Sequence, residues 1–495
     1  MPVYTLEILV VALGFVMLMV DAFVKLEDKR SLAWLGVLGL VIVFGLLFLV
    51  RWPDLGDDPS PFWQFYAHGD SLSLFFKGIA ILSTILVLLM ATEFSSVVVD
   101  LTARPEEGAH PQGGLGEFFT LPVFACAGLM WMASANNLVS IFVSLEFVTI
   151  TFYVLVAYLR RNVGSLEAGV KYLVLGALST GFLVYGFAWL FGLTGSMDLA
   201  EIKVALASGD VNETAALFAF ALILVAMAFK VGAAPFHLWI PDVYQGAPTP
   251  VTAFLSVASK AAGFIVFLRL AGVFLGCELI ADKVILVLTV VAILTLVFGN
   301  LTALPQRNFK RLLAYSSVAH AGFLLMALAS APVAGEAGSR FNPASAIAFY
   351  LGAYLLMTLL AFLVMTVTRQ KIAGEEIDSY RGLAKRSPFL AGALLVAMAS
   401  LAGIPLTAGF LGKLFVFHLA IQQGQWILLA FGILGAAAGF YYYLKIAAAM
   451  YFEKPEEGAD TSALTITIPV RVAMVLLIVG IFAAGIHPGL LFALM

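Results

Sequence analysis

The fold of this chain is decided by the stretch FKVGAAPFHLWIPDVYQGAPTP, residues 229–250, which ends a long apolar run. It places Lys230 and His237 on either side of a break formed by Gly232 and Pro235. An ammonium group in hydrocarbon costs several kcal/mol, and a helix interrupted inside a bilayer must line protein or water rather than lipid. The stretch therefore predicts a broken transmembrane helix in a protein that moves a charge across a membrane.

The composition of the whole chain also indicates a membrane protein. Of its 495 residues, 62% are hydrophobic and 12% are charged, whereas a soluble chain of this length carries abundant surface charge. Apolar runs of about 20 residues, long enough to cross a bilayer, recur from end to end. The first run carries Glu7 and lacks a basic n-region and a cleavage site, which predicts a retained helix rather than a signal peptide.

Several classes of function are disfavoured by what the sequence lacks. A net charge of −3 argues against binding of nucleic acid. Cys126 and Cys277 form neither a metal-binding spacing nor a disulfide framework. The sequence contains no dinucleotide fingerprint, P-loop, cysteine cluster for an iron–sulfur centre or haem-type histidine pair. We therefore expect this chain to bind no metal and no redox cofactor of its own.

Hydropathy predicts an all-α membrane protein with about fourteen transmembrane helices. The expected spans are 3–24, 32–50, 71–93, 115–134, 137–159, 166–193, 214–240, 250–275, 283–304, 311–331, 344–368, 388–422, 425–452 and 467–493. The seventh and twelfth spans are long, and each is broken, at Gly232–Pro235 and at Gly403–Pro405.

Two breaks five spans apart predict a repeated unit of five helices, in which spans four to eight match spans nine to thirteen. An odd number of spans inverts the second copy, which is a common plan of transporters. The chain would then form a single polytopic domain, 1–495. Its expected parts are three N-terminal helices (3–93), a first repeat (115–275), a second repeat (283–452) and a last helix (467–493).

The basic residues predict the orientation. Of the 27 lysines and arginines, sixteen fall in loops and end turns on one side of this topology and five on the other. The positive-inside rule then places both termini outside the cytoplasm. The six that remain lie within spans, and all are lysines: Lys77, Lys171, Lys230, Lys260, Lys413 and Lys445.

This bias towards lysine fits proton transfer, because a desolvated lysine can release its proton whereas arginine stays charged. Lys230, Lys260 and Lys413 lie beside breaks or small residues and are expected to be buried and functional. Lys171 could equally reach the interface. Lys77 and Lys445 are expected to be interfacial anchors, so that Lys77→Ala should have almost no effect.

Other polar residues within the spans have alternative interpretations. Glu146 lies deep in the fifth span, where a site shared with a lysine is favoured over a lone protonated carboxyl group. His237, beside the first break, and His320, in mid-span, could relay protons or be ordinary satisfied histidines. The aromatic cluster 441–443 is expected to be packing, and the motif 242–250 a tight structural turn.

Several longer motifs of this sequence resemble those of a known protein family. They are MASANNL (132–138), EAGVKY (167–172), the stretch 229–254, ASKAAG (258–263), RNFKRLLAYSS (307–317) and GIPLTAGF (403–410). With these, nearly the whole chain resembles the subunit N family of bacterial NADH-quinone oxidoreductase, respiratory complex I. The resemblance implies an antiporter-like fold with inverted repeats. By motif, it implies that the proton relay consists of Glu146, Lys230, Lys260, Lys413 and Lys171.

The implied function is translocation of protons, driven by electron transfer from NADH to quinone in partner subunits that hold NADH, FMN, iron–sulfur clusters and quinone. The implied partners are the other membrane and peripheral subunits, especially the neighbouring antiporter-like ones, in the inner membrane of a bacterial cell. Two alternatives stay open: a subunit of a multi-subunit cation/proton antiporter, and a ferredoxin-fed relative of complex I. A structural scaffold is disfavoured, because inert packing would use leucine or alanine in place of intramembrane lysines.

Overall fold

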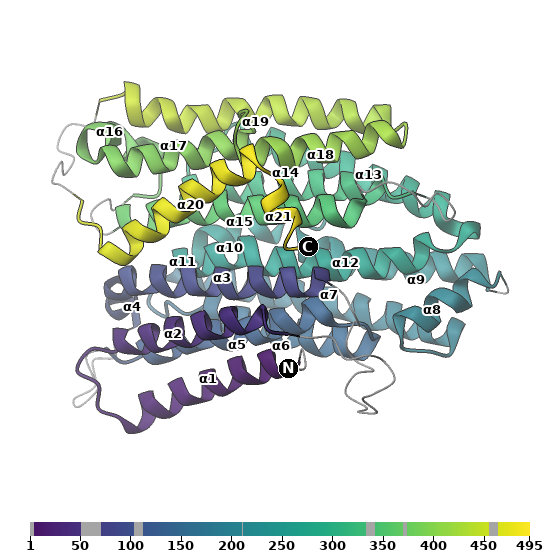
Figure 1. Ribbon diagram of the computed structural model, residues 1–495, viewed down its shortest axis with the longest axis horizontal. Coiled ribbons are helices and arrows are strands. Elements are labelled where there is room, and N and C mark those ends of the chain that lie inside the picture. The colour runs from purple at the N-terminus through teal and green to yellow at the C-terminus, as the bar shows by residue number, and fades with distance from the viewer. Residues whose placement is uncertain are drawn as a thin grey trace.

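The computed structural model describes residues 4–50, 71–102, 112–209, 211–332, 342–369, 374–454 and 464–495, and its helices run roughly side by side (Figure 1). Within these residues, thirteen helices are long and apolar enough to cross a membrane. They are α1 (Tyr4–Phe23), α2 (Arg30–Leu47), α3 (Ser71–Glu93), α5 (Leu115–Ser134), α6 (Leu138–Val156), α7 (Val163–Thr194), α9 (Glu213–Val231), α11–η2–α12 (Thr249–Leu275), α13 (Glu278–Ala303), α14 (Phe309–Ala329), α15 (Pro343–Thr368), α19 (Trp426–Phe452) and α20 (Ile468–Ile486).

Two shorter apolar helices, α17 (Pro388–Ala402) and α18 (Ala408–Gln422), together make the remaining crossing. The prediction of an all-α membrane protein with about fourteen spans is therefore confirmed. The short elements are α4 (Ser95–Thr102), α8 (Leu199–Ala207), α10 (Trp239–Gly246), η3 (Ile377–Tyr380), α16 (Leu383–Arg386) and α21 (Gly489–Phe492).

Both predicted breaks are present, and both begin at a glycine. α9 ends at Val231, and Gly232 follows with φ of 79°; α17 ends at Ala402, and Gly403 follows with φ of 90°. Glycine adopts this left-handed conformation without the steric cost of a Cβ atom, and its amide caps the last carbonyl groups of the helix. The amide of Gly232 donates to Ala228 and Phe229, and that of Gly403 to Ala399 and Ser400.

Corresponding contacts occur in the two repeats. Asn137, which caps α6, forms an isolated antiparallel bridge with Asp198, and Asn308, which caps α14, forms one with Glu376. In each case, the segment before the second helix of the repeat pairs with the segment between its third and fourth helices. α6 and α14 are the fifth and tenth spans, so the two copies share their plan at opposite membrane faces, as inverted repeats require.

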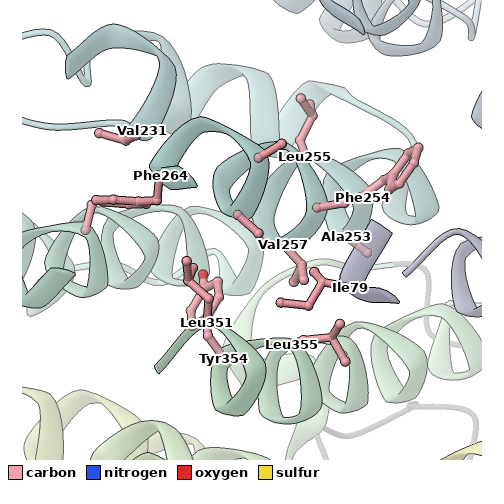
Figure 2. Packing of buried hydrophobic residues seen from close by; sticks show 14 of the residues in the cluster. Ile79, Val231, Ala253, Phe254, Leu255, Val257, Phe264, Leu351, Tyr354 and Leu355 are labelled. Carbon is pink, nitrogen blue, oxygen red and sulfur yellow. The ribbon is translucent and has the colours of Figure 1, made fainter. Parts of the chain in front are cut away.

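The centre of the bundle consists of helices that are buried on nearly all sides. In α11–η2–α12, α14 and α15, 94% of the membrane window is buried, whereas in α1 and α7 only 28% is. Figure 2 shows part of the central cluster, with Ile79 of α3, Val257 of η2 and Leu355 of α15. The outer helices therefore present apolar side chains to lipid or to neighbouring proteins.

Gly409 sits where α18 approaches the end of α17, one turn before Lys413. A Cβ atom on Gly409 would lie 1.9 Å from the carbonyl oxygen of Ser400, whose hydroxyl also accepts from the Gly409 amide at 3.2 Å. We expect Gly409→Ala to force the two half-helices apart and to destabilise the fold by roughly 1–3 kcal/mol, as overpacking typically does. The measurement is thermal unfolding of the purified assembly. Gly392→Ala, on the same pair of half-helices but with open space around it, is the matched control, and equal losses in the two variants would contradict the explanation.

Candidate functional site

Three buried lysines occupy the interior of the bundle and come from three elements. Lys230 lies in the last turn of α9, Lys260 begins α12 and Lys413 lies on α18, and their exposed fractions are 7%, 3% and 6%. Within the described residues, no acidic side chain forms an ion pair with any of them. A buried ammonium without a carboxylate partner is costly to keep charged, so these groups are suited to exchange protons.

The first lysine borders a cavity that it shares with polar residues of α6 and α7. Lys230 Nζ donates to Thr149 Oγ1 at 3.1 Å, and Thr180 Oγ1 donates to Glu146 Oε1 at 2.7 Å. Lys230, Thr149 and Thr180 line a cavity of about 10 Å³, which has room for about one water molecule. Glu146 is half-buried and near enough for its charge to act on Lys230. The predicted Glu–Lys site thus has the form of two groups joined through hydroxyls and a small cavity.

The break in the seventh span brings together a cluster of aromatic rings near this lysine. Trp239, the first residue of α10, donates its indole N–H to the carbonyl oxygen of Phe229 at 3.0 Å, and its ring stacks on Tyr172 at 4.7 Å between centroids. The same carbonyl group also accepts from the Gly232 amide, so the indole adds a second donor at the end of α9. Tyr172 and Phe229 line the same cavity as Lys230, so the break places this aromatic cluster beside that cavity.

The second lysine follows a π-helix that the sequence analysis did not predict. η2 (Leu255–Ser259) directly precedes Lys260, and π-turns are frequently found at functional sites. Lys260 Nζ contacts both the carbonyl and the hydroxyl oxygen of Ser317 on α14. The Ser317 hydroxyl lies 3.2 Å from that of Tyr244 on α10. One serine thus connects the central lysine to the half-helix behind the first break.

His320 lies between the second and third lysines. Its Nδ1 is 2.7 Å from the hydroxyl of Tyr350 and its Nε2 is 3.1 Å from that of Tyr443. The charges of Lys260 and Lys413 both act on it. The interpretation of residues 441–443 as packing alone was therefore wrong for Tyr443, which completes the surroundings of the histidine.

The third lysine is held by the end of the other broken helix. Lys413 Nζ donates to the carbonyl oxygens of Leu401 and Ala402, at 3.0 and 2.8 Å, in the last turn of α17. It also lies 5.3 Å from the ring centroid of Phe323. The C-terminal end of a helix carries a partial negative charge that favours a cation, so the break supplies Lys413 with neutral acceptors.

Two further predicted residues lie apart from these lysines. His237 is buried against Phe298, with ring centroids 6.1 Å apart, and its Nδ1 has no hydrogen-bond partner in the part of the chain that the structure describes. Lys171 is 42% exposed and forms ion pairs with Glu167 and Asp242, both at 2.7 Å. Lys171 is therefore a partly exposed residue that forms surface ion pairs, unlike Lys230, Lys260 and Lys413.

Lys171 and Asp242 line an open hollow of about 450 Å³ between the two repeats. Asp242 also pairs with Arg311 of α14 at 2.9 Å, so the motif 242–250, expected to be a tight turn, in fact begins within helix α10 and joins the repeats. Glu375, on the rim, pairs with Lys310 at 2.9 Å. Partial burial tends to raise the pKa of Glu375, but the positive charges of Lys310 and Arg369 outweigh this effect and hold the pKa below its usual value.

Lys77 is not the interfacial anchor that the sequence predicts. Its side chain is 0% exposed, and its Nζ lies 2.7 Å from Oε1 of Glu7 on α1, whose side chain is 9% exposed. Arg269 of α12 acts on this pair, and it donates to Ser73 Oγ and to the carbonyl oxygen of Ala133 at 2.8 Å. The pair joins two of the N-terminal helices, α1 and α3, and Arg269 connects them to the first repeat. The position of Lys77 near the end of its helix could not reveal this ion pair, because the partner carboxylate comes from another helix.

This chain is similar to several known proteins. Residues 135–439 match the family described as NADH:quinone oxidoreductase/Mrp antiporter, TM. A relative from Trichlorobacter lovleyi, named NADH-quinone oxidoreductase subunit N, is 40% identical, with 98% of this chain and 94% of the relative covered. A chain of respiratory complex I from Thermus thermophilus is 32% identical, with a TM-score of 0.77 and 99% of both chains covered. A chain of the Mrp complex from Dietzia sp. is 20% identical, with a TM-score of 0.78 and 99% and 96% covered, and shares the fold.

Proposed function

Since the chain belongs to the NADH:quinone oxidoreductase/Mrp antiporter family, among relatives named subunit N, we propose that it is a proton-translocating membrane subunit of a respiratory complex I. As a subunit of this translocase, it would perform no redox chemistry itself. NADH, FMN, iron–sulfur clusters and quinone would be held by partner subunits. We further propose that it lies in the inner membrane of a bacterial cell with both termini outside the cytoplasm, because the basic residues gather on the opposite face.

One observation carries the proposal. Lys230, Lys260 and Lys413 are buried amines whose hydrogen-bond partners, among the residues that the structure describes, are hydroxyl and carbonyl oxygens. An inert bundle would have no reason to bear the cost of three such groups, and a salt bridge would hold each proton too firmly to pass it on. The arrangement supports transfer of protons from one amine to the next.

The transfer begins at Glu146. When its carboxylate moves towards the cavity beside Lys230, the positive charge on the lysine is stabilised, and when it moves away the lysine releases its proton. The proton passes to Lys260, which Ser317 holds in place. His320, between the phenol groups of Tyr350 and Tyr443, then carries it towards Lys413 and the outer face. Each charge moved against 100 mV costs about 2.3 kcal/mol, which electron transfer in the partner subunits supplies.

The competing function is exchange of a cation for protons without electron transfer. The test is to isolate the assembly through a tag on this chain, reconstitute it in liposomes and follow the internal pH. We expect flavin and iron–sulfur subunits to co-purify, and acidification of the lumen to require NADH and quinone. An assembly that lacks these subunits and acidifies or alkalinises the lumen in response to a sodium gradient would refute the proposal.

A further inference from the structure

A hollow of about 510 Å³ lies at the membrane face where α2 begins and α3 ends. Its lining comprises Arg30, Trp34, Thr92, Glu93, Ser96, Thr465, Thr467 and Pro469. α2 and α20 each pack against α3, and in Figure 1 the start of α20 and the start of α2 lie on either side of α3. The volume is within the roughly 300–1,000 Å³ range of ligand sites, and no residue of the proton relay contributes to it.

Opposite charges face this hollow. Arg30 Nε donates to Ser95 Oγ at 2.9 Å, while its terminal N–H groups have no hydrogen-bond partner in the described part of the chain. Glu93, which ends α3, accepts a hydrogen bond from the Thr467 hydroxyl. A guanidinium group recognises a phosphate, and a carboxylate recognises an ammonium group. Trp34 is 38% exposed, and an indole ring at this depth can also stabilise an ammonium group.

Apolar side chains continue from the hollow towards the middle of the membrane. On α2, Trp34 is followed at helical spacing by Leu38 and Val41, which are 63% and 51% exposed. On α20, Val472 and Leu476 follow at similar spacing and are 51% and 65% exposed. Residues three or four apart lie on one face of a helix. Each wall of the hollow thus leads into an exposed apolar stripe.

We propose that this hollow binds a glycerophospholipid with a zwitterionic, ammonium-bearing headgroup. Arg30 holds the phosphate, Glu93 and Trp34 hold the ammonium group, and the acyl chains lie along the stripes of α2 and α20. An anionic headgroup without an amine fits less well, because its charge would meet the Glu93 carboxylate. The binding is a property of the N-terminal helices and α20, so it does not depend on the proton relay.

Two measurements on the intact, purified complex test this proposal. In the first, native mass spectrometry compares retention of phosphatidylethanolamine and phosphatidylglycerol after each is added at equal concentration. We expect Glu93→Gln to reduce retention of phosphatidylethanolamine roughly three- to tenfold without reducing that of phosphatidylglycerol, and Arg30→Gln to reduce both. Lys25→Gln, an exposed lysine near the same face that does not line the hollow, is the matched control and should change neither.

The second measurement does not alter the charges. A photo-crosslinking benzophenone amino acid replaces Ser96, which is exposed and lines the hollow, and the product is identified by mass. A crosslink to phosphatidylethanolamine supports the proposal. A crosslink to a protein subunit, or equal retention of both lipids in the wild type and in Glu93→Gln, would overturn it.

Discussion

Replacing Lys230 with methionine is expected to abolish proton translocation, or to reduce it severely, while the complex still assembles. Within the described residues, Lys230 Nζ has a single hydrogen-bond partner, the Thr149 hydroxyl, so the variant breaks no buried ion pair. Methionine fills a similar volume in an apolar site. The measurement is acidification of liposomes per NADH oxidised, together with the amount of complex recovered.

Lys230→Arg separates two explanations of that loss. Arginine keeps the positive charge but does not release a proton, so it should fail to pump if titration is required, and should pump if a fixed charge is enough. Lys203→Met, an exposed lysine of α8, is the matched control and should pump normally. Normal pumping by Lys230→Met would refute the relay.

A single substitution at the pair of Glu7 and Lys77 is expected to have a large effect of a different kind. Lys77→Met leaves the carboxylate of Glu7 buried without its counter-ion, which typically costs 3–5 kcal/mol. We expect a lower unfolding temperature and reduced recovery of the complex, with the number of protons pumped per electron unchanged in whatever assembles.

The double variant Glu7→Leu with Lys77→Met is the decisive comparison. It removes both charges and replaces them with apolar groups, which is often neutral or stabilising at a buried ion pair. Recovery of stability in the double variant would show that the single variant fails because of an uncompensated charge. A stable single variant would instead restore the sequence-based view of Lys77 as an anchor.

The backbone of the fold could be predicted because its signals are local in sequence. The two breaks follow from the dihedral freedom of Gly232 and Gly403, and both helices end at these residues. The number of spans follows from hydropathy, and a recurring break five spans later indicates the repeat. None of these inferences needs knowledge of which helix packs against which.

The partners of the site residues could not be predicted in the same way. Ser317 holds Lys260, and Tyr350 and Tyr443 flank His320, but each pair is brought together by packing of helices distant in sequence. The π-helix before Lys260 has no periodic signature in an apolar run. The prediction that Lys77 is an interfacial anchor failed for the same reason. Its position along its own helix says nothing of the carboxylate that another helix supplies.

The neutral surroundings of the three lysines bear on the direction of proton flow in the relay that we propose. Because the hydrogen-bond acceptors of the three amines are hydroxyl and carbonyl oxygens and none is a carboxylate, no amine of the proposed relay is held in a buried ion pair. A relay without such an ion pair would not by itself favour one direction of proton flow. In the relay that we propose, the direction would instead be imposed at one end, by movement of the Glu146 carboxylate beside Lys230.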